Sequence, residues 1–501
     1  MGRRRTLTGA KELYADFSYI RLKNTLMTIT RSLCCIFFFA LLSCKGEGQE
    51  LPAKTTWEGK LGAIRLILKI SEDSISKKKT AVFDSPDQAA YDIPVSRLTV
   101  SKDSLTAFSA ALAQGFSGAF NADQTKIEGN WNYNGKQAPM VLTRVANKAA
   151  LKRPQTPKAP FPYIAQDVIF YNKAKSVQYG ATLTVPDLKK KYPAVVMITG
   201  SGQLDRDETA FGHKLFWVIA DYLSRHGIAV LRVDDRGIGK STGNFPESTS
   251  PVFASDVLVA VDYLKNQPGI DPKKIGLIGH SEGGVIGPIA ITQSKDIAFL
   301  VSMAGLGVKG SDIMMSQSRA AYKKVGLTDA ELLRIDTLNQ IMFRLSGQYK
   351  EMDALRPEFK KEMKAWLSRQ PEDFLKRTGL KGPSADQIIE GKAAAFFSTW
   401  MRYFLVYDPA DFLPKVKIPV LAINGEKDQQ VYAKENLDGF KKYLTQAGNK
   451  NFKTIAFPNL NHFFQHATTG DASEYAEIEE TISPEVLKTM ADWINGLYSL
   501  K

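Results

Sequence analysis

The sequence predicts a mixed α/β fold: a mostly parallel sheet with helices on both faces and a helical insertion, preceded by a small all-β domain. Within 50–150, apolar and polar residues alternate in short runs that are separated by turn residues, which is typical of β-strands. Within 163–501, longer apolar runs alternate with helical stretches, as in sheets buried on both faces. At 501 residues, with 44% hydrophobic and 24% charged residues, the chain is a globular protein of two or more domains.

Residues 1–44 have the pattern of an export leader. Arg31 precedes an apolar run from Leu33 to Leu42, which is too short for a transmembrane helix and typical of a signal peptide. Leu41-Leu-Ser-Cys44 resembles a bacterial lipobox, which implies cleavage before Cys44 and lipidation of its thiol. Met27 is well placed as the true start, and the alternative is an unusually long basic leader. We therefore expect an exported protein, anchored by lipid to the bacterial cell envelope and facing the periplasm or the surface.

The net charge of +14 does not predict a nucleic-acid partner. Up to Arg31 the leader carries seven basic and two acidic residues, so about +9 remains, spread along the chain without a dense basic stripe. A basic surface of this kind also suits an anionic membrane or a merely soluble protein. After Cys44 there is no further cysteine, so the predicted domains contain no disulfide.

Two segments divide the chain further. Residues 151–162 contain four prolines, which predicts a stiff spacer between the domains. From about 308 to 406 no strand is expected, and Thr328-Asp-Ala-Glu331 is a capping box that begins a helix. A later helix carries Phe396, Phe397, Trp400 and Phe404, which either form the core of this insertion or line an acyl pocket. The insertion is expected to form a lid over a site.

The sequence Gly279-His-Ser281-Glu-Gly283 is the strongest chemical signal. An apolar strand precedes it and an apolar helix follows, which is the setting of a nucleophile elbow. Only glycine lets the strand and helix pass so closely while the serine takes a strained backbone conformation. Ser281 is therefore predicted to be a nucleophile. We expect His280, its neighbour on the elbow, to face away from the serine.

A serine hydroxyl needs a base, and the base needs an acidic partner. Of the five histidines, His462 follows the last apolar run, and His466, one helical turn later, is its competitor. Asp428 follows the apolar run Val420–Ile423, and Glu426 is the alternative acid.

Stabilisation of the tetrahedral oxyanion requires backbone donors. One is the N–H of Glu282, directly after the nucleophile. The other is expected in the loop Gly200-Ser-Gly-Gln-Leu-Asp-Arg-Asp207, where we select the N–H of Ser201, with Gly202 next.

Several of these elements together resemble a known family. They are Gly200-Ser-Gly, Asp205-Arg-Asp207, Asp234-Asp-Arg-Gly-Ile-Gly-Lys-Ser241, Gly279-His-Ser-Glu-Gly-Gly284 and Gly425-Glu-Lys-Asp428. They are similar to bacterial α/β-hydrolases of the serine aminopeptidase and prolyl-oligopeptidase-like esterase group. The resemblance covers about Asp167 to Tyr498 and implies an α/β-hydrolase fold with the acid after a late strand and the base after the last one. One departure is Gln203-Leu204, where the family has a proline. The Gly-x-Trp and Trp-x-Gly elements of the β domain resemble a calycin-like domain found ahead of some secreted hydrolases.

Other motifs do not indicate a cofactor or metal. Gly305-Leu-Gly-Val-Lys-Gly310 follows a strand, but no βαβ unit continues it, so it does not predict nucleotide binding. Gly239-Lys-Ser241 lacks the first glycine of a phosphate loop, and the spacing of His462 and His466 gives no zinc motif.

The sequence leaves three functions open. The first is a carboxylic ester hydrolase that acts on a small-molecule or peptide acyl substrate through an acyl-enzyme. The second is an aminopeptidase, in which Asp205, Asp207 or Glu282 would hold the substrate amine. The third is a cell-envelope binding lipoprotein in which the β domain holds the ligand.

Overall fold

The computed structural model describes residues 51–498, apart from gaps at 62–63, 74–75, 86–89, 111, 113, 134–135, 147–151, 325, 350, 379, 382–388, 390–392 and 394–395. The leader 1–44, with Met27 and Cys44, lies outside the described residues. The described chain forms two compact units. The first lies within Met1–Ala150 and Pro371–Gly391, and the second within Leu151–Gln370 and Lys392–Lys501.

The first unit is built on one antiparallel sheet. Its strand order is β4-β3-β2-β1-β9-β8-β7-β6-β5, and every neighbouring pair is antiparallel. The strands are β1 (Lys54–Leu61), β2 (Ile64–Glu72), β3 (Lys79–Ser85), β4 (Ala90–Pro94), β5 (Arg97–Val100), β6 (Ser104–Ser109), β7 (Gln114–Phe120), β8 (Lys126–Tyr133) and β9 (Lys136–Val145). The predicted all-β domain is confirmed.

The core of this sheet follows from the alternation of its strands. Along β1 the side chains alternate between exposed and buried, so one face of the strand carries the apolar residues. Trp57 lies opposite Leu68, and Leu68 lies opposite Phe83, which gives a buried row across three strands. The ring of Phe83 also meets Trp131 of β8 edge to face at 5.1 Å. Pairs of this kind fix the register of the sheet.

The proline-rich segment binds to the second unit. The guanidinium of Arg153 donates to four backbone carbonyls there, those of Phe211, Gly212, Ala476 and Ile478. Where the sequence predicts a stiff spacer, the described residues from 152 onward therefore form part of the second unit.

The second unit contains an eight-stranded sheet in the order β10-β11-β15-β12-β16-β17-β18-β19. Strand β11 is antiparallel to both of its neighbours, and from β15 to β19 all pairs are parallel. The strands are β10 (Ile164–Tyr171), β11 (Gln178–Val185), β12 (Tyr192–Ile198), β15 (Ala229–Val233), β16 (Ile270–His280), β17 (Leu300–Met303), β18 (Val420–Gly425) and β19 (Phe452–Phe457). This arrangement confirms the predicted α/β-hydrolase fold. A short hairpin, β13 (Thr209–Ala210) with β14 (His213–Lys214), lies outside the sheet.

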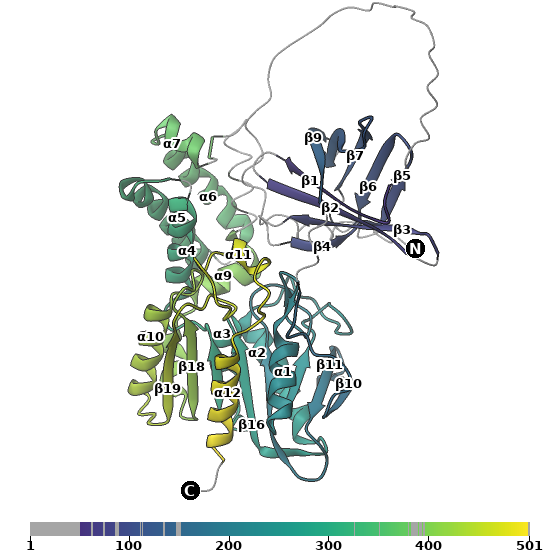
Figure 1. The fold of residues 1–501 in the computed structure, drawn as a ribbon. Coiled ribbons are helices and arrows are strands. Elements are labelled where there is room, and N and C mark those ends of the chain that lie inside the picture. The colour runs from purple at the N-terminus through teal and green to yellow at the C-terminus, as the bar shows by residue number, and fades with distance from the viewer. Residues whose placement is uncertain are drawn as a thin grey trace, which may run out of the picture. The chain divides into compact units, whose positions relative to one another are not determined.

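Helices cover both faces of this sheet, and β12 shows why. Val195 and Met197 pack into one apolar core, whereas Ala194, Val196 and Ile198 pack into the other. Helices α1 (Leu215–Arg225) and α12 (Pro484–Gly496) cover the first face, and they lie side by side in Figure 1. Helices α2 (Ser250–Lys265), α3 (Gly283–Gln293) and α10 (Ala433–Gln446) cover the second face.

The insertion between β17 and β18 is helical, as predicted, and the described residues of 308–406 contain no strand. It comprises α4 (Gly310–Lys324), α5 (Asp329–Gln348), α6 (Met352–Leu367), α7 (Glu372–Arg377) and α9 (Thr399–Val406). The capping box is confirmed, because Thr328 and Glu331 exchange hydrogen bonds at the start of α5. Short 3₁₀ turns at Pro409–Asp411 and Leu413–Lys415 lead into β18, and α11 (Ala472–Tyr475) precedes α12.

Candidate active site

Three predicted site residues follow strands of one sheet. Ser281 comes directly after β16, Asp428 three residues after β18, and His462 five residues after β19. Strands β16 to β19 are parallel, so their carboxyl ends meet at one edge, with His280 opposite Met303 and Gly425 opposite Phe457. Open α/β sheets bind their ligands at this edge.

The turn that carries Ser281 is sterically tight. Ser281 has φ +53°, a left-handed conformation that is uncommon and strained for a residue with a side chain. A Cβ on Gly279 would lie 2.2 Å from the carbonyl oxygen of Gly283, and a Cβ on Gly283 would lie 2.3 Å from that of Ile198. The N–H of Ser281 donates to the carbonyl of Met303 at 2.8 Å, which anchors the turn to β17. These are the features that a nucleophile elbow requires.

The structure brings His462 and Asp428 together. Nδ1 of His462 lies 2.7 Å from Oδ2 of Asp428, and the two residues are 3% and 1% exposed. Oδ1 of Asp428 accepts the backbone N–H groups of Gln430 and Val431, both at 2.8 Å. The carboxylate is thus fixed from behind, and its bond to Nδ1 leaves Nε2 as the imidazole nitrogen for proton transfer.

The two alternatives from the sequence lie elsewhere. His466 is exposed, and its Nδ1 lies 2.9 Å from Oε2 of Glu480. Glu426 is also exposed to solvent. Neither of them joins the pair formed by His462 and Asp428.

The loop after β12 passes beside the serine. A Cβ on Gly200 would lie 3.3 Å from Cβ of Ser281. The N–H of Gly200 donates to Oε1 of Glu208 at 2.8 Å, so this N–H is already engaged. Ser201 and Gly202, the two predicted oxyanion-loop positions, come next and are exposed.

The departure from the family pattern at Leu204 has a structural counterpart. The N–H of Leu204 donates to Oδ2 of Asp235 at 2.8 Å, while the hydroxyl of Thr199 donates to Oδ1 of the same carboxyl at 2.7 Å. A proline at position 204 would have no N–H to donate. Asp235 therefore joins the residue before the loop to the middle of the loop.

Glu282 is predicted for its backbone N–H, but its side chain is also part of the site. It is 2% exposed, and its Oε1 accepts the indole N–H of Trp400 and the hydroxyl of Ser250, both at 2.7 Å. Burial raises the pKa of this carboxyl. Trp400, one of the aromatic residues predicted in the insertion, thus joins α9 to the elbow and also stacks on Phe404 at 5.0 Å.

The side chain of His280, which we expect to face away from the serine, binds another titratable group. Its Nδ1 lies 2.9 Å from Oε1 of Glu208, and its Nε2 lies 3.0 Å from the backbone oxygen of His462. Glu208 is not indicated by any local motif of the sequence, because its partners Gly200 and His280 lie 8 and 72 positions away in the chain.

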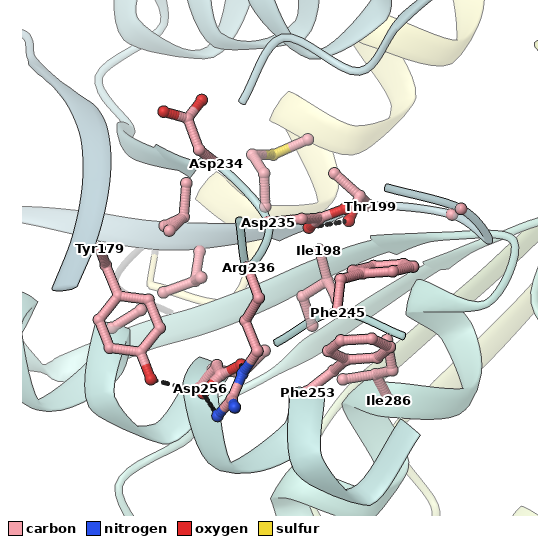
Figure 2. A pocket seen from close by; sticks show the side chains of 17 residues that line it. Tyr179, Ile198, Thr199, Asp234, Asp235, Arg236, Phe245, Phe253, Asp256 and Ile286 are labelled. Atoms are coloured by element: carbon pink, nitrogen blue, oxygen red, sulfur yellow. Dashed lines mark hydrogen bonds and ion pairs between the residues drawn. The ribbon is translucent and has the colours of Figure 1, made fainter. Parts of the chain in front are cut away.

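A small cavity of about 60 Å³ lies beside the loop that follows β12. Gly200 and Gly202 line it, as do Phe245 and Phe253, whose rings stack at 5.2 Å. Figure 2 shows these two rings together, with Asp235 directed toward Thr199. Asp235 keeps part of its surface exposed, but the atoms packed around its carboxyl raise its pKa to about 8.

The described residues include neither a metal-binding cluster nor a membrane-spanning helix. In that part of the chain, no three His, Cys, Asp or Glu residues form a group that could hold a metal ion. No helix within it has the length and apolar character needed to cross a membrane.

Known proteins resemble parts of this chain. Residues 148–462 match the family described as X-Pro dipeptidyl-peptidase (S15 family). Esterase EstD of Thermotoga maritima is 27% identical over 281 residues, which are 56% of this chain and 56% of the esterase, so just over half of that relative is covered. Mouse dipeptidyl peptidase 8 is 33% identical over 138 residues, 26% of this chain and 15% of the peptidase.

Solved structures with low sequence identity also match. The α/β hydrolase GrgF from Penicillium sp. sh18 is 17% identical with a TM-score of 0.40, over 67% of this chain and 100% of that one. The Pyrococcus furiosus esterase Pf2001 is 15% identical with a TM-score of 0.39, over 70% of this chain and 99% of that one.

Proposed function

Because the chain belongs to the X-Pro dipeptidyl-peptidase (S15) family, we propose that it is a serine hydrolase that cleaves carboxylic esters. In this proposal Ser281 is the nucleophile, His462 the general base and Asp428 the acid that orients the base. The observation that supports it most is the 2.7 Å bond between His462 Nδ1 and Asp428 Oδ2, at the sheet edge where the strained Ser281 follows β16. The order Ser281, Asp428, His462 along the chain is that of α/β-hydrolases.

The reaction proceeds in two halves. Oγ of Ser281 attacks the ester carbonyl while Nε2 of His462 takes the hydroxyl proton. The tetrahedral intermediate collapses to an acyl-serine, and His462 gives its proton to the departing alkoxide. Water then attacks the acyl-serine, again with His462 as base, and the carboxylic acid leaves. Asp428 keeps the base in the required tautomer and stabilises the imidazolium that forms in each half.

The oxyanion of the intermediate is bound by the N–H groups of Glu282 and Ser201. The assignment of Ser201 is supported by the neighbouring Gly200, whose own N–H already donates to Glu208. The close approach of Gly200 to the side chain of Ser281 brings this loop to the reacting carbonyl.

The proposal is tested with a fluorophosphonate probe, which forms a covalent adduct with an activated serine. Wild-type protein is expected to label, and Ser281→Ala is expected not to. Ser255→Ala is the matched control, because Ser255 is an exposed serine on α2. Labelling that persists in Ser281→Ala would show that another residue is the nucleophile.

One observation favours a second candidate, a peptidase that recognises a substrate amine. Of the three carboxylates considered for this role, Asp205 accepts hydrogen bonds from Thr209, and Asp207 pairs with Arg232 and Lys214. Glu282 instead has neutral donors around its Oε1, next to the nucleophile. Among the described residues no cation pairs with this buried carboxylate, so a substrate ammonium beside it would supply the missing positive charge.

The substitution Glu282→Gln separates the two candidates. A peptidase would lose far more turnover on an aminoacyl p-nitroanilide than on a p-nitrophenyl butyrate ester, by about tenfold or more, because the ammonium loses its partner. An esterase would show the same loss on both substrates, or no amide turnover even in the wild type. The ratio of kcat/KM for the two substrates is the quantity to measure.

We further propose that the protein is exported and lipid-anchored through Cys44, which lies outside the described residues. The support is the sequence pattern around Arg31 and Leu41–Cys44. Expressed in a bacterium, the wild type is expected in the membrane fraction and to incorporate a labelled fatty acid. Cys44→Ser is expected to lose both, and unchanged fatty-acid incorporation in this variant would contradict the anchor.

A further inference from the structure

A buried ion pair lies beneath the elbow, formed by Glu208 and His280. Each residue is 2% exposed, and Oε1 of Glu208 lies 2.9 Å from Nδ1 of His280. Glu208 ends the loop that follows β12, and His280 is the last residue of β16, directly before Ser281. A charged pair at this depth is costly unless its remaining hydrogen bonds are satisfied.

Both nitrogens of His280 are hydrogen-bonded to acceptors. Nδ1 faces the carboxylate of Glu208, and Nε2 faces the backbone oxygen of His462 at 3.0 Å. An imidazole can donate from both nitrogens only when it is protonated. Burial by itself lowers the pKa of His280, but the charge and hydrogen bond of Glu208 and the carbonyl of His462 outweigh it, so the net pKa is raised.

The same carboxylate oxygen also holds the oxyanion loop. Oε1 of Glu208 accepts the N–H of Gly200 at 2.8 Å, in addition to the bond from His280. This fixes the orientation of the peptide group before Gly200 and so directs the next peptide, which carries the N–H of Ser201. A continuous chain of hydrogen bonds therefore runs from the Gly200 loop through the elbow to the backbone of His462.

We propose that Glu208 and His280 are positioning residues, which hold the N–H of Ser201 and the imidazole of His462 in register with Ser281. This role rests on the proposed function, because it assigns Ser201 and His462 their parts in that reaction. Neither Glu208 nor His280 touches the substrate. They act by fixing two loops, which follow β12 and β19, relative to one nucleophile.

A purely structural ion pair is the competing explanation, and one feature argues against it. Oε2 of Glu208 is buried and has no hydrogen-bond partner in the described part of the chain. A carboxylate that served only to stabilise the core would be expected to satisfy both oxygens. Here Oε1 of Glu208 accepts both donors, the N–H of Gly200 and Nδ1 of His280, and these two donors connect the catalytic loops.

The test removes the negative charge of Glu208 and keeps the shape of its side chain. Glu208→Gln keeps an oxygen for the Gly200 N–H but removes the anion that holds His280 protonated. We expect kcat on p-nitrophenyl butyrate to fall by about 10- to 100-fold, because small displacements of catalytic groups have effects of this size. KM should change by less than about threefold, and the rate of fluorophosphonate labelling should fall in parallel with kcat. Asp336→Asn is the matched control, because Asp336 pairs with Arg319 within the insertion.

The pH profile distinguishes positioning from stability. The titratable groups that face His280 are Glu208, His462 and Asp428. Because its raised pKa depends on Glu208, the alkaline limb of kcat should move to lower pH in Glu208→Gln. If the pair were merely structural, Glu208→Gln would lower the amount of folded protein and leave the pH of the alkaline limb unchanged.

A second variant covers the case in which Glu208→Gln does not fold. His280→Gln is neutral and keeps an N–H donor, and it should show the same loss of kcat. The double variant should be no worse than either single one, because both break one chain of bonds. Wild-type labelling together with unchanged kcat and pH profiles in the folded variants would overturn the positioning role alone. Absence of labelling in the wild type would instead overturn the proposed function.

Discussion

Within the described residues, two buried histidine–carboxylate pairs differ in how the second nitrogen of the histidine is used. At the ends of β18 and β19, Asp428 binds Nδ1 of His462 and satisfies its other oxygen with two backbone N–H groups. Beneath the elbow, Glu208 binds Nδ1 of His280, whose other nitrogen is bonded to a carbonyl. A histidine that transfers protons needs one uncommitted nitrogen, whereas a histidine that positions a loop can commit both.

The largest expected effect is the loss of the imidazole of His462. His462→Ala removes the proposed base, and we expect kcat on a short acyl ester to fall by about 10⁴- to 10⁶-fold, as for triad knockouts in general. His466→Ala, which removes an exposed histidine four residues away, should leave kcat within about twofold. Equal effects of the two substitutions would show that His462 is not special.

The next effect concerns the acid of the same pair. Asp428→Asn preserves shape but favours the wrong tautomer of His462, so kcat should fall by about 10⁴-fold. Glu426→Gln, at an exposed residue of the same loop, is the matched control. If Asp428→Asn retained more than a tenth of wild-type turnover, the orienting role would be wrong.

A third buried histidine, His213, sharpens the comparison because its pKa moves in the opposite direction. Burial, aided by the charge of Arg153, lowers the pKa of His213 to about 4. As the pH falls, His213 of the unfolded chain therefore becomes protonated near pH 6.5, whereas His213 of the folded chain becomes protonated only near pH 4. The free energy of unfolding should therefore decrease by up to about 3 kcal/mol as the pH falls from about 6.5 to about 4. Urea titrations of wild type and His213→Gln at several pH values check this, and the variant should lose much of the dependence.

For His280 the sign is reversed. Its folded pKa is raised, so its contribution to stability is fully present below about pH 6.5 and is lost as the pH rises through the folded pKa. If the free energy of unfolding of the wild type falls at alkaline pH and that of His280→Gln does not, the result would agree with this assignment. The same dependence of the free energy of unfolding on pH in both proteins would contradict it.

The smallest effect concerns the elbow itself. Ser281 holds φ +53°, a conformation that glycine adopts without strain. Ser281→Gly should therefore be more stable than Ser281→Ala by about 1 kcal/mol, although we expect both to be inactive. Chemical denaturation of the two variants side by side measures this difference. Equal midpoints would mean that the turn stores no strain.

How far the sequence predicts this molecule depends on the range of the interactions. The elbow is a local pattern, so Ser281 and its glycines could be identified from a few adjacent residues. His462 could be selected among five histidines because the fold orders its strands along the chain. Glu208 could not be identified, because its role arises only when Gly200, His280 and His462 meet through tertiary structure. The attachment of Arg153 to the second unit was missed for the same reason, since composition describes a proline-rich segment but not its partners.

The most direct test of the account is to find where a phosphonate adduct forms. Fluorophosphonate-treated protein is digested, and the modified peptide is sequenced by mass spectrometry in the wild type and in His462→Ala. The account predicts one adduct, on Ser281, formed far more slowly when the imidazole of His462 is gone. An adduct on any other residue, or one on Ser281 formed at an unchanged rate in His462→Ala, would contradict it.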